Sequence, residues 1–283
     1  MTEVETPLIS NTGNPEPEIH SIRTDAGGYL RTSPEFALKR MLAAGYGDVY
    51  ELGRVFRAGE SGRFHNPEFT LLEWYRNGMD YHRLMDEVAA LVRHCGGGHY
   101  EQWPETRVSY HELFLRHLDV DPFTTTSENL AKIAGLHGIT DIELNRKQWL
   151  DLLISHVIQP ALPAQSLTFV YDYPADQAAL ANVRDDARPV AERFELFLGT
   201  IELANGYQEL TDAAEQNHRF EQQNEQRQSR GESVVEIDHH LIDALAHGME
   251  KCAGVALGVD RLMMSICGAD SLNEVIAFPH SRA

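Results

Sequence analysis

The spacing of hydrophobic and polar residues separates expected strands from expected helices. Residues 49–57 and 69–76 are short runs rich in β-branched and aromatic residues, and the polar loop 58–67 lies between them, so we expect two strands there. Strand character returns in four later segments: 167–173, 191–203, 207–210 and 254–258. After the second strand, apolar residues recur every three or four positions, which predicts a helix. They are Tyr81, Leu84, Met85, Val88, Leu91 and Val92.

Helices are also expected in four other parts of the chain. Ser33 suits an N-cap, Pro34 suits the first helical position, and Gly45 follows the last turn of the same helix. Further helices are expected within 110–162, over 213–230 and from near Asp260. Strands thus cluster at both ends of the chain, with helices between and after them. This pattern indicates an α+β fold with an antiparallel sheet flanked by helices.

Chain length and composition favour one globular domain. A chain of 283 residues with 42% hydrophobic residues builds a sizeable core, so we expect a single domain over 1–283 with a helical insertion at about 110–165. No apolar run approaches the roughly 20 residues of a membrane helix. The first residues have neither the basic nor the apolar region of a signal peptide. Three cysteines are few and odd in number, which fits the reducing cytoplasm better than a disulfide framework.

The charge of the chain is strongly acidic. It has 24 Lys and Arg against 43 Asp and Glu, a net charge of −19. Solubility alone accounts for such an excess. However, proteins that grip an RNA backbone need a basic surface, so extensive RNA binding is not expected. No glycine-rich phosphate loop of the P-loop or dinucleotide kind is present, so any nucleotide is bound in another way.

Three polar or aromatic residues of the second expected strand share one face. Phe69, Glu73 and Tyr75 are separated by even numbers, so their side chains point the same way. The opposite face is also partly apolar, which implies a strand covered on both sides. A carboxylate there is costly to bury without a partner. Either Glu73 lies at an edge and meets water or an arginine, or the three residues form a pocket for a cationic amine.

A second group of carboxylates surrounds the dipeptide Asn205-Gly206. Asn-Gly is a strong signal for a two-residue hairpin turn. If these residues form the turn, Glu202 and Glu209 face each other directly, which destabilises a ladder unless a positive group lies near them. That group is a divalent metal, a substrate ammonium or an arginine. The alternative is a solvated hairpin tip, which the apolar neighbours of this segment disfavour.

Two arginines follow strand ends. Arg261 lies in the first turn of the last expected helix, after the small-residue strand that ends at Gly258, and an anion such as phosphate would stabilise a cation there. The alternative is that Asp260 simply neutralises Arg261. Arg57 ends the first expected strand, and arginine suits bidentate phosphate recognition.

Together these segments resemble the three motifs of class II aminoacyl-tRNA synthetases, in order along the chain. Residues 3–7 resemble the end of motif 1, residues 56–75 motif 2 and residues 254–261 motif 3. Two segments are specifically similar to lysyl-tRNA synthetase. They are Glu-Phe-Thr-Leu-Leu-Glu-Trp-Tyr at 68–75 and Ile-Glu-Leu-Ala-Asn-Gly-Tyr-Gln-Glu-Leu at 201–210. The resemblance covers nearly the whole chain and implies the class II catalytic fold.

Three departures point to a shortened relative of that enzyme. The sequence has no counterpart of the anticodon-binding barrel and begins at the end of motif 1, without the preceding helix of the family's dimer interface. Ala256 stands where lysyl-tRNA synthetase has a motif 3 glycine. The motif 2 text Phe-Arg-Asn-Glu-Gly appears here as Phe-Arg-Ala-Gly-Glu at 56–60. The stand-alone elongation factor P–(R)-β-lysine ligase family is similar in length, in Ser33-Pro34-Glu35, in Asn66 and in Ala256.

The resemblance implies roles for named residues. Phe69 stacks the adenine, Arg57 holds the α-phosphate and Arg261 the outer phosphates of ATP. Arg57, Glu202 and Arg261 are then the catalytic residues, and Glu195 and Glu202 hold Mg²⁺. The residues implied in ATP binding are Arg57, Gly59, Glu60, Asn66, Phe69, Glu202, Gly258 and Arg261. Those implied in amino-acid binding are Ser33, Pro34, Glu35, Glu73, Tyr75, Asn205, Glu209 and Ala256.

The implied activity is a ligase reaction that needs no protein nucleophile. ATP would activate β-lysine or lysine as an adenylate, and the aminoacyl group would pass to a lysine side chain of elongation factor P. The resemblance implies a cytoplasmic homodimer, with neither tRNA nor a membrane as partner. Two alternatives stay open: a lysyl-tRNA synthetase fragment that charges tRNA, and a non-catalytic paralogue that acts as a regulator.

Overall fold

Strands β5 and β6 form the antiparallel pair that the hydrophobic pattern predicts. In the computed structural model, which describes residues 1–283, β5 spans Val49–Phe56 and β6 spans Glu68–Asn77. Strand β12 (Cys252–Gly258) pairs antiparallel with the other side of β6. The short strand β1 (Thr2–Glu3) lies parallel to β5 at the edge. The expected motif 2 and motif 3 segments are therefore neighbours in one sheet, although about 180 residues of sequence separate them.

The chain divides into two compact units. Unit 1 comprises Met1–Asp80 with Glu209–Ala283, and unit 2 comprises Tyr81–Gln208. Both units contain helices and mostly antiparallel strands, which confirms the α+β class. The expectation that the whole chain is one domain stays a prediction. No helix in the structure combines the length and the apolarity that a membrane crossing requires.

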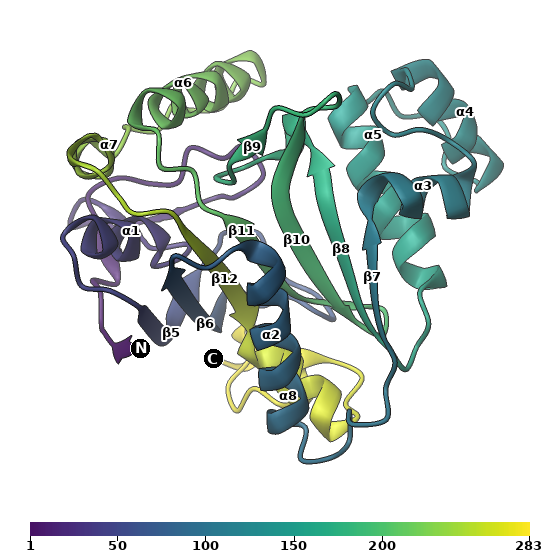
Figure 1. Ribbon diagram of the computed structural model, residues 1–283, viewed down its shortest axis with the longest axis horizontal. Helices are drawn as coiled ribbons and strands as arrows, with labels where there is room; N and C mark the ends of the chain where they lie inside the picture. Colours follow the sequence, from purple (N-terminus) through teal and green to yellow (C-terminus); the bar gives the residue numbers. More distant parts are fainter. The chain divides into compact units, whose positions relative to one another are not determined.

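Unit 1 adds helices and a small second sheet to the β1-β5-β6-β12 sheet. Helix α1 (Glu35–Ala43) packs against α7 (His239–His247), and α7 packs against α6 (Ala213–Ser229), as Figure 1 shows at one end of this unit. Helix α8 (Val259–Cys267) follows β12 directly and packs against β6. The remaining elements are β2 (Ile9–Ser10), β3 (Ile22–Arg23), β4 (Tyr29–Leu30), and the 3₁₀ turns Leu272–Glu274 and His280–Arg282.

Helix α1 begins and ends near the predicted signals. Its N-cap residue is Pro34, and Ser33 Oγ accepts a hydrogen bond from the Glu35 N–H at 3.0 Å. Gly45 adopts φ +84° after the last turn, a conformation that glycine tolerates without strain. The buried positions of the helix are Leu38, Lys39 and Leu42. A lysine therefore shares the face that packs into unit 1, which the hydrophobic pattern did not predict.

Unit 2 contains a further group of paired strands and a layer of helices. Strand β8 (Leu167–Pro174) lies between β7 (Glu105–Ser109, parallel) and β10 (Val190–Leu198, antiparallel), and β10 also pairs antiparallel with β11 (Ile201–Gln208) and β9 (Val183–Arg184). In Figure 1, α3, α4 and α5 of this unit lie beside β7 and β8. The helical elements are α2 (Tyr81–Cys95), α3 (Tyr110–Leu118), α4 (Ser127–Leu136), α5 (Arg146–Leu153), a π-turn at Ile154–Ile158, and 3₁₀ turns at Gln159–Ala161 and Ala175–Gln177.

The prediction of a hairpin turn at Asn205-Gly206 is wrong. These residues lie inside β11, where Asn205 pairs with Glu195 and Gly206 with Phe194. The turn lies at Gly199 and Thr200 instead, between the paired residues Leu198 and Ile201. Gly199 adopts φ +60°, and a Cβ there would overlap the Ala164 carbonyl oxygen, so this position requires glycine. The expected strand at 191–203 is consequently two strands, and the expected strand at 207–210 continues the second of them.

Candidate active site

Glu73 is the centre of a buried polar cluster in unit 1. It lies on β6 and is 2% exposed, with Tyr75 on the same face. Tyr75 Oη donates a hydrogen bond to Glu73 Oε1 at 2.7 Å, and Ser33 Oγ donates one to Glu73 Oε2 at 2.7 Å. The interpretation that Glu73 lies at a solvated edge is therefore wrong. Two hydroxyl donors hold its carboxylate in one orientation.

Three further charged residues extend this cluster from α1 and from the segment after β11. Lys39 Nζ lies 2.9 Å from Glu35 Oε1 and 2.6 Å from Glu209 Oε2, and its side chain is 0% exposed. The Glu209 N–H donates to the Cys252 carbonyl at 3.0 Å, which ties Glu209 to β12. Glu209 Oε1 is buried and has no hydrogen-bond partner within the protein. A buried carboxylate oxygen without a hydrogen-bond donor is energetically costly, so this atom is suited to accept a hydrogen bond from a ligand ammonium.

Sequence reasoning missed Lys39. The available signal was its position four residues after Glu35, which places both side chains on one helix face. Its flanking residue Leu38 and the nearby Leu42 also marked this face as the buried one. An exposed i,i+4 ion pair is the usual reading of such spacing, and only the packing of α1 shows that this pair is buried.

Burial raises the pKa values of the cluster's carboxyl groups. Burial is the main cause that raises the pKa of Glu73 to about 8, and the charge of Glu35 adds to it. Burial also raises the pKa of Glu209 to about 7, although the ammonium of Lys39 opposes this shift. Burial alone would lower the pKa of Lys39, but Glu209 and Glu35 outweigh it and the pKa lies above its usual value. Lys39 is therefore a permanent cation, whereas two carboxyl groups titrate near neutral pH.

Strand β12 provides a narrow floor next to this cluster. Its residues Gly254 and Ala256 pair with Tyr75 and Glu73, respectively, across the β6–β12 ladder. A Cβ at Gly254 would overlap both Glu209 Oε1 and the Tyr75 ring. Glycine at 254 thus permits the close approach of these two groups. Ala256 lies two residues further along the same face, beside Glu73.

Arg57 and Phe69 lie together at the other end of the β5–β6 pair. The Arg57 guanidinium carbon lies 5.1 Å from the centre of the Phe69 ring, within the range of a cation–π contact. Arg57 Nε donates to the Thr32 carbonyl at 3.3 Å, and its guanidinium lies 3.6 Å from Glu60. Gly59 adopts φ +79° in the loop between the strands. The structure thus brings together four of the residues expected to bind ATP or to support its binding loop.

Asn66 holds this loop to the C-terminal segment. Its side-chain amide donates to the Glu68 carbonyl at 2.6 Å, and its oxygen accepts from the His280 N–H at 2.9 Å. Both polar atoms of the amide are therefore engaged with backbone. In this structure Asn66 organises the loop, and its expected role in ATP binding stays a prediction.

Arg261 lies in the first turn of α8, which begins directly after Gly258. Its guanidinium donates to the Phe64 carbonyl at 3.2 Å and contacts His65 Nε2 at 2.9 Å. Asp260 accepts a hydrogen bond from the Thr70 N–H at 2.7 Å. The carboxylate is thus engaged with the backbone of β6, and Arg261 reaches the loop that carries Arg57.

The expected Mg²⁺ ligands lie in unit 2. Glu195 on β10 forms an ion pair with Arg193 at 2.5 Å, and burial followed by the charge of Glu202 raises its pKa to about 7 against the opposing effect of Arg193. Asn205 pairs with Glu195 across the ladder, and its Oδ1 is buried without a hydrogen-bond partner within the protein. The prediction that Glu202 and Glu209 face each other across a hairpin turn is wrong, because Glu202 pairs with Phe197.

The donor set of unit 2 fits only a metal that arrives with other ligands. No group of three or more His, Cys, Asp or Glu side chains that could hold a metal occurs in the chain. Mg²⁺ commonly binds one or two protein carboxylates together with substrate phosphates. Glu195 and Glu202 fit a magnesium ion of this kind, bound together with a nucleotide.

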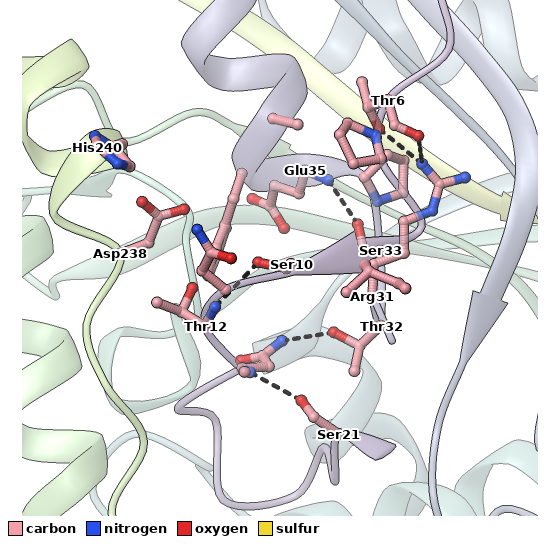
Figure 2. A pocket seen from close by; sticks show the side chains of 18 of the residues that line it. Thr6, Ser10, Thr12, Ser21, Arg31, Thr32, Ser33, Glu35, Asp238 and His240 are labelled. Carbon is pink, nitrogen blue, oxygen red and sulfur yellow. Dashed lines mark hydrogen bonds between the residues drawn. The ribbon is translucent and has the colours of Figure 1, made fainter. Parts of the chain in front are cut away.

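A cavity of about 440 Å³, lined by both polar and apolar residues, lies in unit 1. Figure 2 shows Ser33 and Glu35 on one side of it and Asp238 and His240 on the other, with Ser10 and Thr12 between them. Its volume is in the range of small-molecule sites. Ser33 and Glu35 belong both to its wall and to the carboxylate cluster, whereas Lys39, Glu73 and Glu209 do not line it.

The chain is similar throughout its length to proteins of known family. The family described as tRNA synthetases class II (D, K and N) matches residues 1–282. A protein of Yersinia enterocolitica named elongation factor P–(R)-beta-lysine ligase is 46% identical over 100% of this chain and 90% of its own length. Proteins with the same name from Photorhabdus laumondii and Vibrio cholerae are each 45% identical, with the same coverage.

Proposed function

The chain belongs to the family of class II tRNA synthetases (D, K and N), and from this membership we propose that it is an elongation factor P–(R)-β-lysine ligase. It would use ATP to activate (R)-β-lysine, or lysine, and would transfer the product to a lysine side chain of elongation factor P. The observation that carries the proposal is the cluster of Glu35, Glu73 and Glu209. Three carboxylates around one buried lysine suit a substrate with more than one ammonium group.

The proposed first step is adenylation. A carboxylate oxygen of the amino acid attacks the α-phosphorus of ATP, and the bond to the β-phosphate oxygen breaks to release pyrophosphate. Arg57 would stabilise the charge on the α-phosphate and Arg261 would bind the outer phosphates, while Phe69 would stack on the adenine. Alignment of the two substrates supplies the remaining acceleration, so no protein nucleophile is needed.

Magnesium would supply charge neutralisation of the phosphates when bound, and Glu195 and Glu202 would hold it. The second step is aminoacyl transfer. The neutral ε-amine of the acceptor lysine attacks the adenylate carbonyl, the bond to the phosphate oxygen breaks, and AMP leaves. The amide product retains the ammonium groups that the carboxylate cluster would have bound.

The amino-acid site would consist of the cluster and its neighbours. Glu73 and Glu209 would each bind an ammonium or share one, with Tyr75 orienting Glu73. Glu209 Oε1 is the strongest candidate atom because it is buried and has no partner within the protein. The residues of unit 1 proposed to complete this site are Ser33, Pro34, Glu35 and Ala256, while the expected role of Asn205, in unit 2, stays a prediction.

The proposal is tested by a transfer assay with four arms. Purified protein receives ATP, Mg²⁺ and radiolabelled lysine or β-lysine, with either elongation factor P or tRNA as acceptor. We expect label on elongation factor P, with β-lysine the better substrate, and little on tRNA because a net charge of −19 disfavours the RNA backbone. Charging of tRNA alone would indicate a lysyl-tRNA synthetase, and no ATP–pyrophosphate exchange with either amino acid would indicate a non-catalytic paralogue.

We also propose that the protein acts in the cytoplasm as a homodimer. The support is the family resemblance together with exposed large apolar residues of unit 1, among them Leu8, Ile9, Tyr46 and Leu52. Isolated surface leucines are ordinary, but several on one unit are consistent with an interface. Light scattering after size exclusion should give twice the 31.9 kDa chain mass, and a monomer mass at micromolar concentration would contradict the dimer.

A further inference from the structure

We propose that Lys39 is a positioning residue that matches the charge of the amine site to a substrate with two ammonium groups. The inference rests on the proposed diamino-acid substrate and concerns a residue to which the motif resemblance assigns no role. Lys39 is completely buried, and its Nζ contacts Glu35 and Glu209 at 2.9 and 2.6 Å. It therefore sits among the carboxylates proposed to bind the amines, without being one of the ligand-binding acceptors itself.

Charge counting shows why a built-in cation is useful. Glu35, Glu73 and Glu209 carry three negative charges when ionised, and Lys39 leaves two, which equals the positive charge on the amines of lysine or β-lysine. Without Lys39, three carboxylates would repel one another at low dielectric and would hold protons instead. An ammonium ligand would then have to displace those protons, and its apparent affinity at neutral pH would fall.

The two carboxylate oxygens of Glu209 also have different surroundings. Its Oε2 contacts Lys39, whereas its Oε1 is buried near Gly254 with no hydrogen-bond partner within the protein. One oxygen is thus held by the internal cation while the other is left for a ligand. This arrangement fixes the rotamer of Glu209 before the substrate arrives, which reduces the entropy lost on binding.

The charged and titratable groups that face Lys39 come from three elements besides the Glu209 segment. Helix α1 itself contributes Glu35, β6 contributes Glu73 and Tyr75 to the same cluster, and β12 contributes Cys252, a thiol whose pKa burial raises. Helix α7 packs against α1 but exposes its ionisable residues and buries only Leu241 and Leu245. Among these groups, Glu209 is the carboxyl whose pKa the ammonium of Lys39 lowers.

The test compares Lys39→Met and Lys39→Arg with the parent in ATP–pyrophosphate exchange between pH 6 and 9. We expect kcat/KM for the amino acid to rise with pH, and loss of the cation should move the midpoint of this rise upward by about one pH unit. At pH 7 the variant should then have a roughly tenfold lower kcat/KM than the parent, and this difference should disappear or reverse by pH 9. KM for ATP should stay within about twofold of the parental value, since the substitution changes the charge of the amine site and leaves the nucleotide contacts intact. Lys39→Arg should keep the parental midpoint, because it keeps the charge.

A second measurement follows the protonation of the carboxylate cluster without catalysis. Calorimetry of lysine binding at pH 7, in two buffers of different ionisation enthalpy, should show roughly one more proton released by Lys39→Met than by the parent. Exposed Lys251→Met is the matched control and should behave as the parent. Circular dichroism and ATP titration establish that each variant is folded, and Lys39→Gln replaces Lys39→Met if the latter does not fold.

The outcomes distinguish a failure of the proposed function from a failure of the proposed role of Lys39. A parent protein that shows no exchange with any diamino acid contradicts the proposed function itself. An active parent whose Lys39→Met variant loses activity equally at every pH, with unchanged proton release, overturns the role of Lys39. Failure of both neutral variants to fold would equally overturn it, because Lys39 would then serve stability.

Discussion

At the scale of single residues, Glu73 is the group whose chemistry is most constrained. Its two oxygens accept hydrogen bonds from Ser33 and Tyr75 at 2.7 Å, so its remaining lone pairs have few directions left for a ligand. Glu73→Gln should raise KM for the amino acid roughly 10- to 100-fold, the effect of losing one charge-assisted contact, and change KM for ATP by less than about twofold. Glu68→Gln, at an exposed position of the same strand, is the control. Calorimetry that shows equal losses of affinity for the amino acid and for ATP would contradict this difference.

Arg57 should affect the chemical step instead. Removing a charge-assisted contact to the reacting phosphate costs about 3 kcal/mol, so Arg57→Ala should slow ATP–pyrophosphate exchange roughly a hundredfold. Arg54→Ala changes an exposed arginine of the same β5 strand and should leave the rate close to that of the parent. Exchange that persists undiminished in Arg57→Ala would remove the assignment of the phosphate site.

Ala256 is the residue proposed to distinguish the substrate isomers. It pairs with Glu73 across the ladder, two residues from Gly254, where an added Cβ would overlap Glu209 and Tyr75. A methyl group in so narrow a site should disfavour α-lysine, whose amino group lies next to the carboxylate. Since one carbon is worth about 1–3 kcal/mol, Ala256→Gly should raise adenylation of α-lysine by roughly tenfold or more and change β-lysine less. Equal effects on both isomers would mean that Ala256 serves packing alone.

At the scale of elements, β12 acts as a spacer whose small residues set the distance between β6 and the Glu209 segment. Gly254→Ala places a Cβ against Glu209 Oε1 and the Tyr75 ring, and neither buried group has room to withdraw. We expect a loss of amino-acid activation of at least about 100-fold, with ATP binding retained. Gly135→Ala is the matched control, since a Cβ there meets nothing within 4 Å. A fully active Gly254→Ala would show that the cluster rearranges freely.

At the scale of the whole molecule, the buried carboxyl groups link stability to pH. The folded-state pKa of Glu73 is about 8 and that of Glu209 about 7, both above the ordinary value of 4.5. Folding therefore favours their protonated forms, and the stability they contribute at low pH is lost as the pH rises through the folded-state values. The free energy of unfolding should fall by on the order of a few kcal/mol between pH 5 and 8.5.

A diamine ligand should reverse this loss. Its ammonium groups stabilise the ionised carboxylates, so the rise in Tm on adding lysine should be larger at pH 8.5 than at pH 6. The Glu73→Gln variant, which lacks one titrating group, should show a flatter dependence of Tm on pH. A Tm that increases from pH 6 to 8.5 in the ligand-free protein would contradict the raised pKa values.

The sequence by itself determined much of the fold and part of the arrangement of the candidate site residues. Runs of β-branched and aromatic residues predicted β5 and β6, and apolar residues at three- and four-residue spacing predicted α2, because both patterns are local. Glu73 and Tyr75 were correctly placed on one face, since even spacing along a strand decides this locally. The α+β class followed from the order of such elements.

Only the tertiary structure decided what depends on distant partners. Asn205-Gly206 has the local preference for a turn, but pairing with β10 holds both residues inside β11, and Gly199 forms the turn. The spacing of Glu35 and Lys39 is also compatible with an exposed i,i+4 pair, and only the packing of α1 brings Glu209 to Lys39 from more than 160 positions away. Backbone preference is local and can be read from neighbours, whereas burial and charge pairing depend on contacts that exist only after the chain has folded.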